Sequence, residues 1–160
     1  MTNKIKFNYA IAIFLFLITA NCGFKIIDKT NINNYNIKDI VTTGDIRISY
    51  KIKNNLLINS KKESNNNLII NIETKKKKEI KEKNIKNEIV KYQIKIIANL
   101  EVNFINKGQK FKINQSAEGE YSVESTYSTT LTNEKKLIES LTEDISDKIQ
   151  NKLNLLINDN

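Results

Sequence analysis

Residues 90–104 read VKYQIKIIANLEVNF, the clearest alternation of apolar and polar residues in the chain. One set of side chains is Val90, Tyr92, Ile94, Ile96, Ala98, Leu100, Val102 and Phe104. The set between them is Lys91, Gln93, Lys95, Ile97, Asn99, Glu101 and Asn103. Successive side chains of a strand point to opposite faces, so this pattern predicts a strand in a sheet with one buried and one exposed face.

Further strands are predicted on both sides of this stretch. Residues 68–73 alternate with period two, and residues 74–87 are dominated by Lys and Glu. After residue 104, Gly108 can adopt the positive φ of a hairpin turn over residues 106–109. The returning strand contains Phe111, Ile113, Tyr121 and Val123. Gly119 within it predicts a bulge or a bend.

The segment before residue 68 predicts a strand and a helix. Residues 36–41 form a short alternating strand, and a turn leads to Asp45, whose carboxylate can cap a helix. The predicted helix runs to about residue 60. The residues that repeat at helical spacing and are expected on one face are Ile46, Tyr50, Lys53 and Leu57. Ile48 and Ile52 would also permit a strand here.

The C-terminal segment predicts a long amphipathic helix capped by Thr132. Its stripe consists of Ile138, Leu141, Ile145, Ile149, Leu153 and Leu156. Such a stripe requires a covering layer, and we expect the domain's own sheet to provide it. The element order is therefore β-α-β-β-β-α. The expected fold is α+β, with two helices packed on one face of a mostly antiparallel four-stranded sheet.

Composition excludes several classes of enzyme. The 160 residues contain no His, no Trp, no Pro and one Cys. General acid–base catalysis at neutral pH thus lacks its usual side chain, and a zinc or thiolate site lacks its usual ligands. We expect no catalytic residue, no metal and no cofactor. The formal net charge is +8, and every basic residue except Arg47 is Lys.

The first residues resemble a bacterial lipoprotein signal. Lys4 and Lys6 precede an apolar run over residues 10–20, which is too short for a transmembrane helix of about 20 residues but suits an export signal. Asn21 and then Cys22 follow this run, and Cys22 is the only Cys in the chain. The resemblance implies acylation of Cys22 and cleavage before it, and several acyl chains anchor a protein firmly. Two alternatives are an ordinary cleaved signal and an uncleaved anchor.

These features predict three segments. Residues 1–21 are the lipoprotein signal peptide, residues 22–35 are the acylated N-terminus and a polar tether, and residues 36–160 are a single α+β domain. Gly23 is not the Asp that retains lipoproteins at the inner membrane in better-studied bacteria. The predicted location is therefore the outer membrane, with the domain on the periplasmic side or within a barrel lumen.

Three parts of the mature chain together resemble a known family. They are Cys22-Gly23-Phe24, the strand and helix over residues 40–57, and the pattern from Tyr121 through Tyr127 and Glu134 into the last helix. With these residues the chain resembles the LPS-assembly lipoprotein LptE in its alphaproteobacterial form. The resemblance implies a non-enzymatic lipoprotein whose domain plugs the outer-membrane barrel LptD, the pair delivering lipopolysaccharide to the cell surface.

Residues that could contact a ligand are few. Lys75, Lys76, Lys77 and Lys78 could contact the phosphates of lipopolysaccharide, or they could be a solvated hairpin end that protects a sheet edge. Tyr92 and Tyr121 are expected on adjacent strands, in core packing rather than lining a groove. The acidic residues of the last helix are expected on its polar face, where pairing with Lys148 or Lys152 is weak.

A second function remains open beside the first. An accessory lipoprotein of an ABC-type lipid or small-molecule transporter would bind an apolar ligand in a cleft between the sheet and the helices. A basic chain also suits nucleic acid, but the export segment argues against such a partner.

Overall fold

The computed structural model describes residues 34–158, so the predictions for residues 1–21, for Cys22 and for most of the tether fall on residues outside this range. The elements are β1 (Asn36–Gly44), α2 (Ile46–Ile58), β2 (Asn67–Lys83), β3 (Ile89–Phe104), β4 (Gln109–Ser122) and α3 (Tyr127–Asn158). Their order is β-α-β-β-β-α, which confirms the predicted α+β class.

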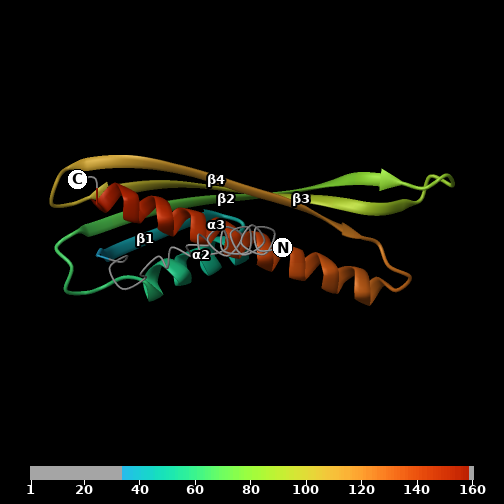
Figure 1. The fold of residues 1–160 in the computed structure, drawn as a ribbon, viewed down its shortest axis with the longest axis horizontal. Coiled ribbons are helices and arrows are strands. Elements are labelled where there is room, and N and C mark those ends of the chain that lie inside the picture. Colours follow the sequence, from blue (N-terminus) through green and yellow to red (C-terminus); the bar gives the residue numbers. More distant parts are fainter. Residues whose placement is uncertain (1–33, 159–160) are drawn as a thin grey trace, which may run out of the picture. The chain divides into compact units, whose positions relative to one another are not determined.

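The four strands form one mixed sheet in the order β1-β2-β3-β4. β1 runs parallel to β2, while β2, β3 and β4 are successive antiparallel neighbours. Figure 1 shows α2 and α3 on the same side of this sheet, as predicted. One face of the sheet is therefore covered by helices, and the other carries the polar residues of the alternating pattern.

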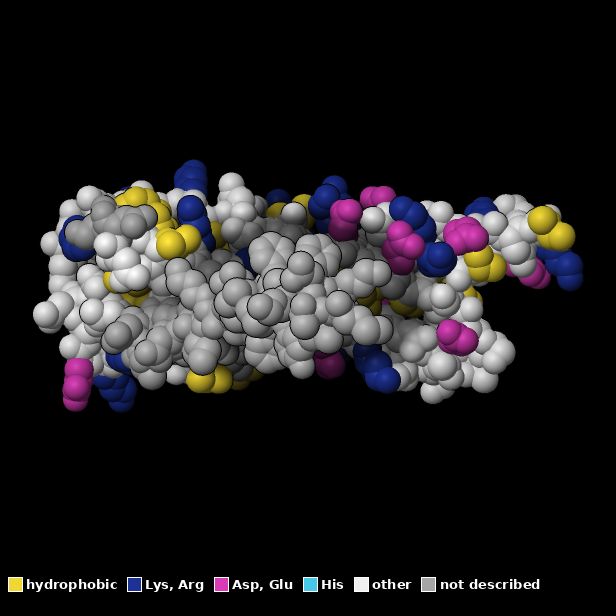
Figure 2. Space-filling view, in the orientation of Figure 1, with side chains coloured by type: hydrophobic (Ala, Val, Ile, Leu, Met, Phe, Trp, Pro, Cys, Tyr) yellow, Lys and Arg dark blue, Asp and Glu magenta, His cyan; other side chains and the backbone are white. Residues whose placement is uncertain are grey.

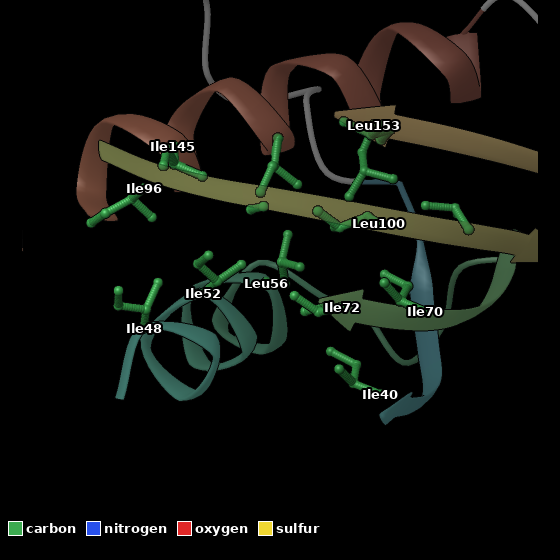
Figure 3. Close-up of a cluster of buried hydrophobic side chains, with 14 of the residues drawn as sticks. Ile40, Ile48, Ile52, Leu56, Ile70, Ile72, Ile96, Leu100, Ile145 and Leu153 are labelled. Atoms are coloured by element: carbon green, nitrogen blue, oxygen red, sulfur yellow. The ribbon is translucent and has the colours of Figure 1, made fainter. Parts of the chain in front are cut away.

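The core lies between the sheet and the two helices. Figure 3 shows Ile70, Ile72, Ile96 and Leu100 of the sheet pointing toward Ile48, Ile52 and Leu56 of α2 and toward Ile145 and Leu153 of α3. The predicted stripe of the last helix is confirmed, since Leu141, Ile145, Ile149 and Leu153 are buried and Ile138 and Leu156 pack against the core. Burial of these apolar side chains is the main stabilising contribution to the fold.

The helix α2 exists where it was predicted, but the predicted apolar face was wrong. Its buried residues are Ile48, Ser49, Ile52 and Leu56. In contrast, Ile46 is 81% exposed and Tyr50 is 62% exposed. Both sets of residues satisfy a helical period, and only the position of the sheet decides which set is buried. The cap is confirmed, because the Oδ1 atom of Asp45 accepts a hydrogen bond from the backbone N–H of Ile48 at 3.2 Å.

Three boundaries differ from the predicted ones. β1 continues to Gly44, and β2 continues from the predicted end at residue 73 to Lys83. The additional residues of β2 pair with the first half of β3, so backbone hydrogen bonds hold a strand that shows no apolar alternation. The helix α3 begins at Tyr127, and the backbone N–H of Thr129 donates to the hydroxyl of Thr126 at 3.2 Å. Thr132 therefore lies inside the helix rather than at its cap.

Gly119 does not mark a bulge, because the register between β3 and β4 is unbroken. A Cβ atom on Gly119 would lie 2.7 Å from the Cδ1 atom of Leu137 in α3. The missing side chain thus allows α3 to approach β4 closely.

Candidate functional site

Strand geometry separates the four predicted lysines. Lys76 and Lys78 lie opposite Ile96 and Ile94 of β3, so they share the helix-covered face of the sheet. Lys75 and Lys77 lie on the open face. A run that is contiguous in sequence is therefore divided between two surfaces, because neighbouring residues of a strand point in opposite directions.

Three of these lysines have carboxylate partners. The distances from Nζ to the carboxylate oxygen are 2.8 Å for Lys75–Glu73, 3.7 Å for Lys76–Asp45 and 2.7 Å for Lys78–Glu134. The first pair lies on the open face of the sheet. The other two pairs join the covered face to the start of α2 and to α3, respectively. Each of these two pairs lines a separate hollow.

The first hollow lies between the outer ends of β3 and β4 and the first turns of α3, and its volume is about 400 Å³. Figure 2 shows a recess at this end of the domain, between the tip of the β2–β3 hairpin and the start of α3. The lining residues are Lys78, Ile89, Tyr92, Tyr121, Val123, Glu124, Tyr127, Thr130, Leu131 and Glu134. The walls are therefore largely apolar and aromatic, with a few charged groups.

A hydrogen-bonded cluster forms the base of this hollow. The Oε2 atom of Glu134 accepts hydrogen bonds from Lys78 Nζ at 2.7 Å and from the hydroxyl of Tyr121 at 2.8 Å. The rings of Tyr92 and Tyr121 are stacked with their centroids 5.6 Å apart. The ammonium group of Lys78 lies 4.4 Å from the centroid of Tyr92, which is a cation–π contact. The expected core packing is confirmed for Tyr121, while Tyr92 is half-buried against the core. Both also line the hollow, which the prediction did not expect.

The cluster holds both of its charged groups in their ionised forms. Burial raises the pKa of Glu134, but hydrogen bonds from Lys78 and Tyr121 outweigh it and the net pKa is lowered. Burial is the largest single effect on Lys78 and lowers its pKa, but its hydrogen bonds and charge interactions with Glu134 and Tyr121 together outweigh burial, and the net pKa is raised. Burial and the contact with Glu134 raise the pKa of Tyr121. At neutral pH the cluster is therefore a stable ion pair beside a neutral phenol.

The second hollow, of about 270 Å³, lies between the start of α2 and the middle of α3. Four cationic side chains line it, Arg47, Lys51, Lys76 and Lys135, together with two carboxylates, Asp45 and Glu139. Lys51 also forms an ion pair with Glu143 at 2.9 Å. The excess of cations gives this hollow the chemistry of an anion-binding surface.

The open face of the sheet is covered by cross-strand ion pairs. Lys95 lies 3.2 Å from Glu118, Lys112 lies 3.4 Å from Glu101, and Lys91 lies 3.1 Å from Glu82. These pairs leave a hydrophilic surface whose opposite charges alternate between neighbouring strands.

Sequence reasoning identified Tyr92, Tyr121 and the lysines but missed how they meet. The prediction ended the strand at residue 73, and Lys78 can face Tyr92 only if that strand continues. Glu134 lies in the predicted pattern of the last segment, yet its contact with β2 depends on how α3 crosses the sheet. The sequence could have indicated the contact between Lys78 and Tyr92 only through the pairing register of a β2–β3 hairpin whose strands continue up to the turn.

Solved bacterial lipoproteins share this fold. The crystal structure of rare lipoprotein B from Shewanella oneidensis has a TM-score of 0.54 and 12% identity, covering 75% of this chain and 97% of that chain. A lipoprotein B from Nitrosomonas europaea has a TM-score of 0.54 and 10% identity, covering 80% and 90% of the two chains. A minor lipoprotein from Acinetobacter baumannii has a TM-score of 0.53 and 9% identity, covering 78% and 94%.

At these identities the likeness shows the fold alone. No protein-family model and no curated protein sequence matches the chain. Neither helix within residues 34–158 combines the length and the apolar content that crossing a lipid bilayer requires.

Proposed function

We propose that this protein is an outer-membrane lipoprotein, anchored by acyl chains on Cys22, that assembles with the barrel protein LptD and helps to deliver lipopolysaccharide to the outer leaflet. One observation carries the proposal. A chain with its only Cys directly after an export segment has a domain with the fold of solved bacterial lipoproteins. The LptE resemblance supplies the barrel partner and the lipopolysaccharide.

The open face of the sheet supports a place inside a barrel. The interior of a wide transmembrane barrel is polar and hydrated. The paired Lys and Glu side chains of β2, β3 and β4 suit such an interior, because each ion pair can stay hydrated and exchange partners with polar groups of the wall. An apolar face would instead favour a dry contact.

The second hollow is the best candidate for a phosphate contact. Lys76 is the predicted lysine that shares a hollow with three other cations. Phosphate groups bind such clusters through charge-assisted hydrogen bonds. Of the predicted set, we therefore assign phosphate contact to Lys76 together with Arg47 and Lys135, and we assign an edge-protecting role to Lys75 and Lys77 on the open face.

We also propose that the protein is not an enzyme. A general acid or base works best when its pKa lies near the working pH. Here the pKa of Glu134 is lowered and the pKa of Lys78 is raised. Both pKa values therefore lie further from neutral pH than the ordinary values of these groups. The cluster in the first hollow therefore suits structural support and ligand contact rather than proton transfer.

Affinity purification from mildly solubilised outer membranes tests the proposed function. We expect the full chain, tagged at its C-terminus, to recover a large barrel protein in about equal amount. The matched control is Arg47→Glu/Lys135→Glu, which we expect to recover the same barrel but to retain less lipopolysaccharide. Recovery of an inner-membrane permease instead of a barrel would overturn the proposal and support an ABC-transporter accessory lipoprotein with a ligand in the first hollow.

A further inference from the structure

β4 is an edge strand of unusual length and regularity. It has 14 residues, and its pairing with β3 contains no register shift. The opposite edge differs. β1 has nine residues, its pairing shifts between Ile37 and Asp39, and the ammonium group of Lys53 donates to the carbonyl of Ile40 at 3.2 Å. Beyond Gly44 this edge is the lysine-rich outer part of β2, whose pairing with β3 shifts between Ile80 and Lys83. Short or irregular edges resist further pairing, and within residues 34–158 the strand β4 is neither short nor irregular in its pairing.

The backbone groups that β4 presents at its free edge can be assigned. The backbone N–H of Val123 donates to the carbonyl of Val90 at 2.9 Å. Continuing the β3–β4 register by one residue past Lys91 and Ser122 places these two residues directly opposite each other. In an antiparallel pair, hydrogen-bonded residues alternate with residues whose N–H and C=O groups point away. The odd-numbered residues of β4 thus bond to β3, and the even-numbered residues from Lys110 to Glu120 point their backbone groups outward.

The charges along this edge are self-complementary. Lys110 and Lys112 lie near the start of β4, while Glu118 and Glu120 lie near its end. From these charges we propose that two copies of this chain pair through their β4 strands, antiparallel and centred on Gln115, into one continuous eight-stranded sheet. Lys110 then lies opposite Glu120 of the partner copy, and Lys112 lies opposite Glu118, which the two-fold symmetry repeats as four ion pairs.

The same register is the one that uses the outward backbone groups best. The charged residues opposite each other are all even-numbered, so they are the hydrogen-bonded pairs of the new ladder. If the β4 strand of one copy is shifted by two residues relative to the other, only one Lys residue of each copy still lies opposite a Glu residue. The proposed register is therefore favoured over its neighbours by charge.

The helix-covered face agrees with this register. Ile113 lies opposite Ala117 of the partner copy, and Phe111 lies opposite Gly119. Each pair places a large apolar side chain beside a small residue, which is how facing positions of a packed layer fit together. Ile113 and Ala117 are buried within one copy, so pairing extends an existing apolar layer.

On the open face the new pairs continue the existing ion-pair pattern. Lys112 already lies near Glu101, and Glu118 already lies near Lys95. Across the two-fold axis these become a row of alternating charges over four strands. This pairing requires neither the acyl chains nor a barrel, and it applies to copies of the chain that are not assembled with a barrel. Its failure would therefore leave the proposed function standing.

Two variants test the pairing, each with charges of a single sign along β4. One is Lys110→Glu/Lys112→Glu, and the other is Glu118→Lys/Glu120→Lys, each made in the full chain and purified in detergent. We expect the native chain to sediment as a dimer and each variant alone to dissociate at least about tenfold more readily. An equimolar mixture should form the heterodimer, because every cross-edge pair is then Lys with Glu. Any effect of the substitutions on the fold of a single copy is the same whether a variant is alone or in the mixture. The mixture therefore separates such effects from the loss of pairing between copies.

Amide hydrogen exchange on the native chain gives a second reading that needs no variant. The backbone N–H groups of Lys112, Asn114, Ser116 and Glu118 should exchange more slowly as the protein concentration rises through the dimerisation range. A native chain that stays monomeric at about 100 µM would overturn the pairing, given that a weak specific contact has a Kd in the micromolar range. A dimer in which these four amides still exchange freely would also overturn it, as would a mixture that forms no heterodimer.

Discussion

Gly44 sits where β1 turns into α2, and its conformation is one that other residues rarely adopt. Its φ is +88°, and a Cβ atom there would lie 1.9 Å from the carbonyl oxygen of Thr74. That carbonyl accepts a hydrogen bond from the backbone N–H of Asp45 at 3.2 Å, so the strand cannot move away without breaking the junction. The cap on α2 and the pairing of β1 with β2 both depend on this contact.

We therefore predict that Gly44→Ala lowers the free energy of unfolding by about 2 kcal/mol or more, through strain and the clash together. Urea unfolding followed by circular dichroism measures this loss. Gly108→Ala is the matched control, because Gly108 has a φ of +64° but nothing within 4 Å of its Cβ position. Its expected cost is about 1 kcal/mol. Equal losses at the two sites would show that the contact with Thr74 contributes nothing.

The Lys78–Glu134 pair should make stability depend on pH. The pKa of Glu134 in the folded chain lies below its ordinary value of 4.5. A carboxylate with a depressed folded pKa stabilises the fold above its unfolded pKa, and this stability is lost as pH falls through the folded pKa. We predict that Glu134→Gln destabilises the protein by about 0.5–1 kcal/mol at pH 7, since the pair is partly exposed and screened.

The predicted difference between Glu134→Gln and the native chain shrinks between about pH 5 and pH 3. Urea unfolding at both pH values measures it. Glu143→Gln is the control, because Glu143 pairs with Lys51 but its side chain is 65% exposed. A difference at Glu134 that is unchanged at pH 3 would argue that the hydrogen bond from Tyr121, and not charge, stabilises this site.

Two neighbouring leucines in α2 show which face of the helix stabilises the domain. Leu56 is 1% exposed and packs in the core, whereas Leu57 is 42% exposed. We predict that Leu56→Ala lowers the free energy of unfolding by about 2–4 kcal/mol and that Leu57→Ala lowers it by less than about 1 kcal/mol. Thermal or urea unfolding of the two variants measures this directly. A larger loss of stability for Leu57→Ala than for Leu56→Ala would contradict the structure and support the helix face that the sequence pattern indicated.

The elements differ in how far their sequences define them. β3 alternates over its whole length, and α3 carries an apolar stripe at helical spacing, so both could be predicted together with the order of elements. The apolar face of α2 could not, because Ile46 and Ile48 begin two equally periodic sets and the choice depends on the distant sheet. The outer half of β2 has no alternation, since its strand character comes from pairing with β3.

The candidate site was harder to predict than the fold for the same reason. Tyr92 and Tyr121 could be placed on adjacent strands from alternation alone. Their meeting with Lys78 and Glu134 requires the extended β2 and the path of α3 over β4, which Gly119 and Leu137 set by close contact. Contacts between elements that are distant in sequence carry no periodic signal in the chain.

At the scale of the whole protein, the proposed anchor at Cys22 and the α+β domain are separate parts of the sequence. Within residues 34–158, side chains of the sheet and of both helices build a continuous apolar core. We therefore predict that Cys22→Ala leaves thermal unfolding of the domain unchanged but moves the protein from the membrane fraction to the soluble periplasmic fraction. Asn21→Ala keeps the thiol and should stay with the membrane. A Cys22→Ala chain that remains in the membrane would point to an uncleaved anchor.

The intact mass of the protein isolated from its own membranes tests the proposed anchor most directly. We predict a mature chain that begins at Cys22 and carries a diacylglyceryl group on its thiol and a fatty acyl group on its new amino terminus. A chain with a free thiol at Cys22, or one that retains residues 1–21, would contradict the account.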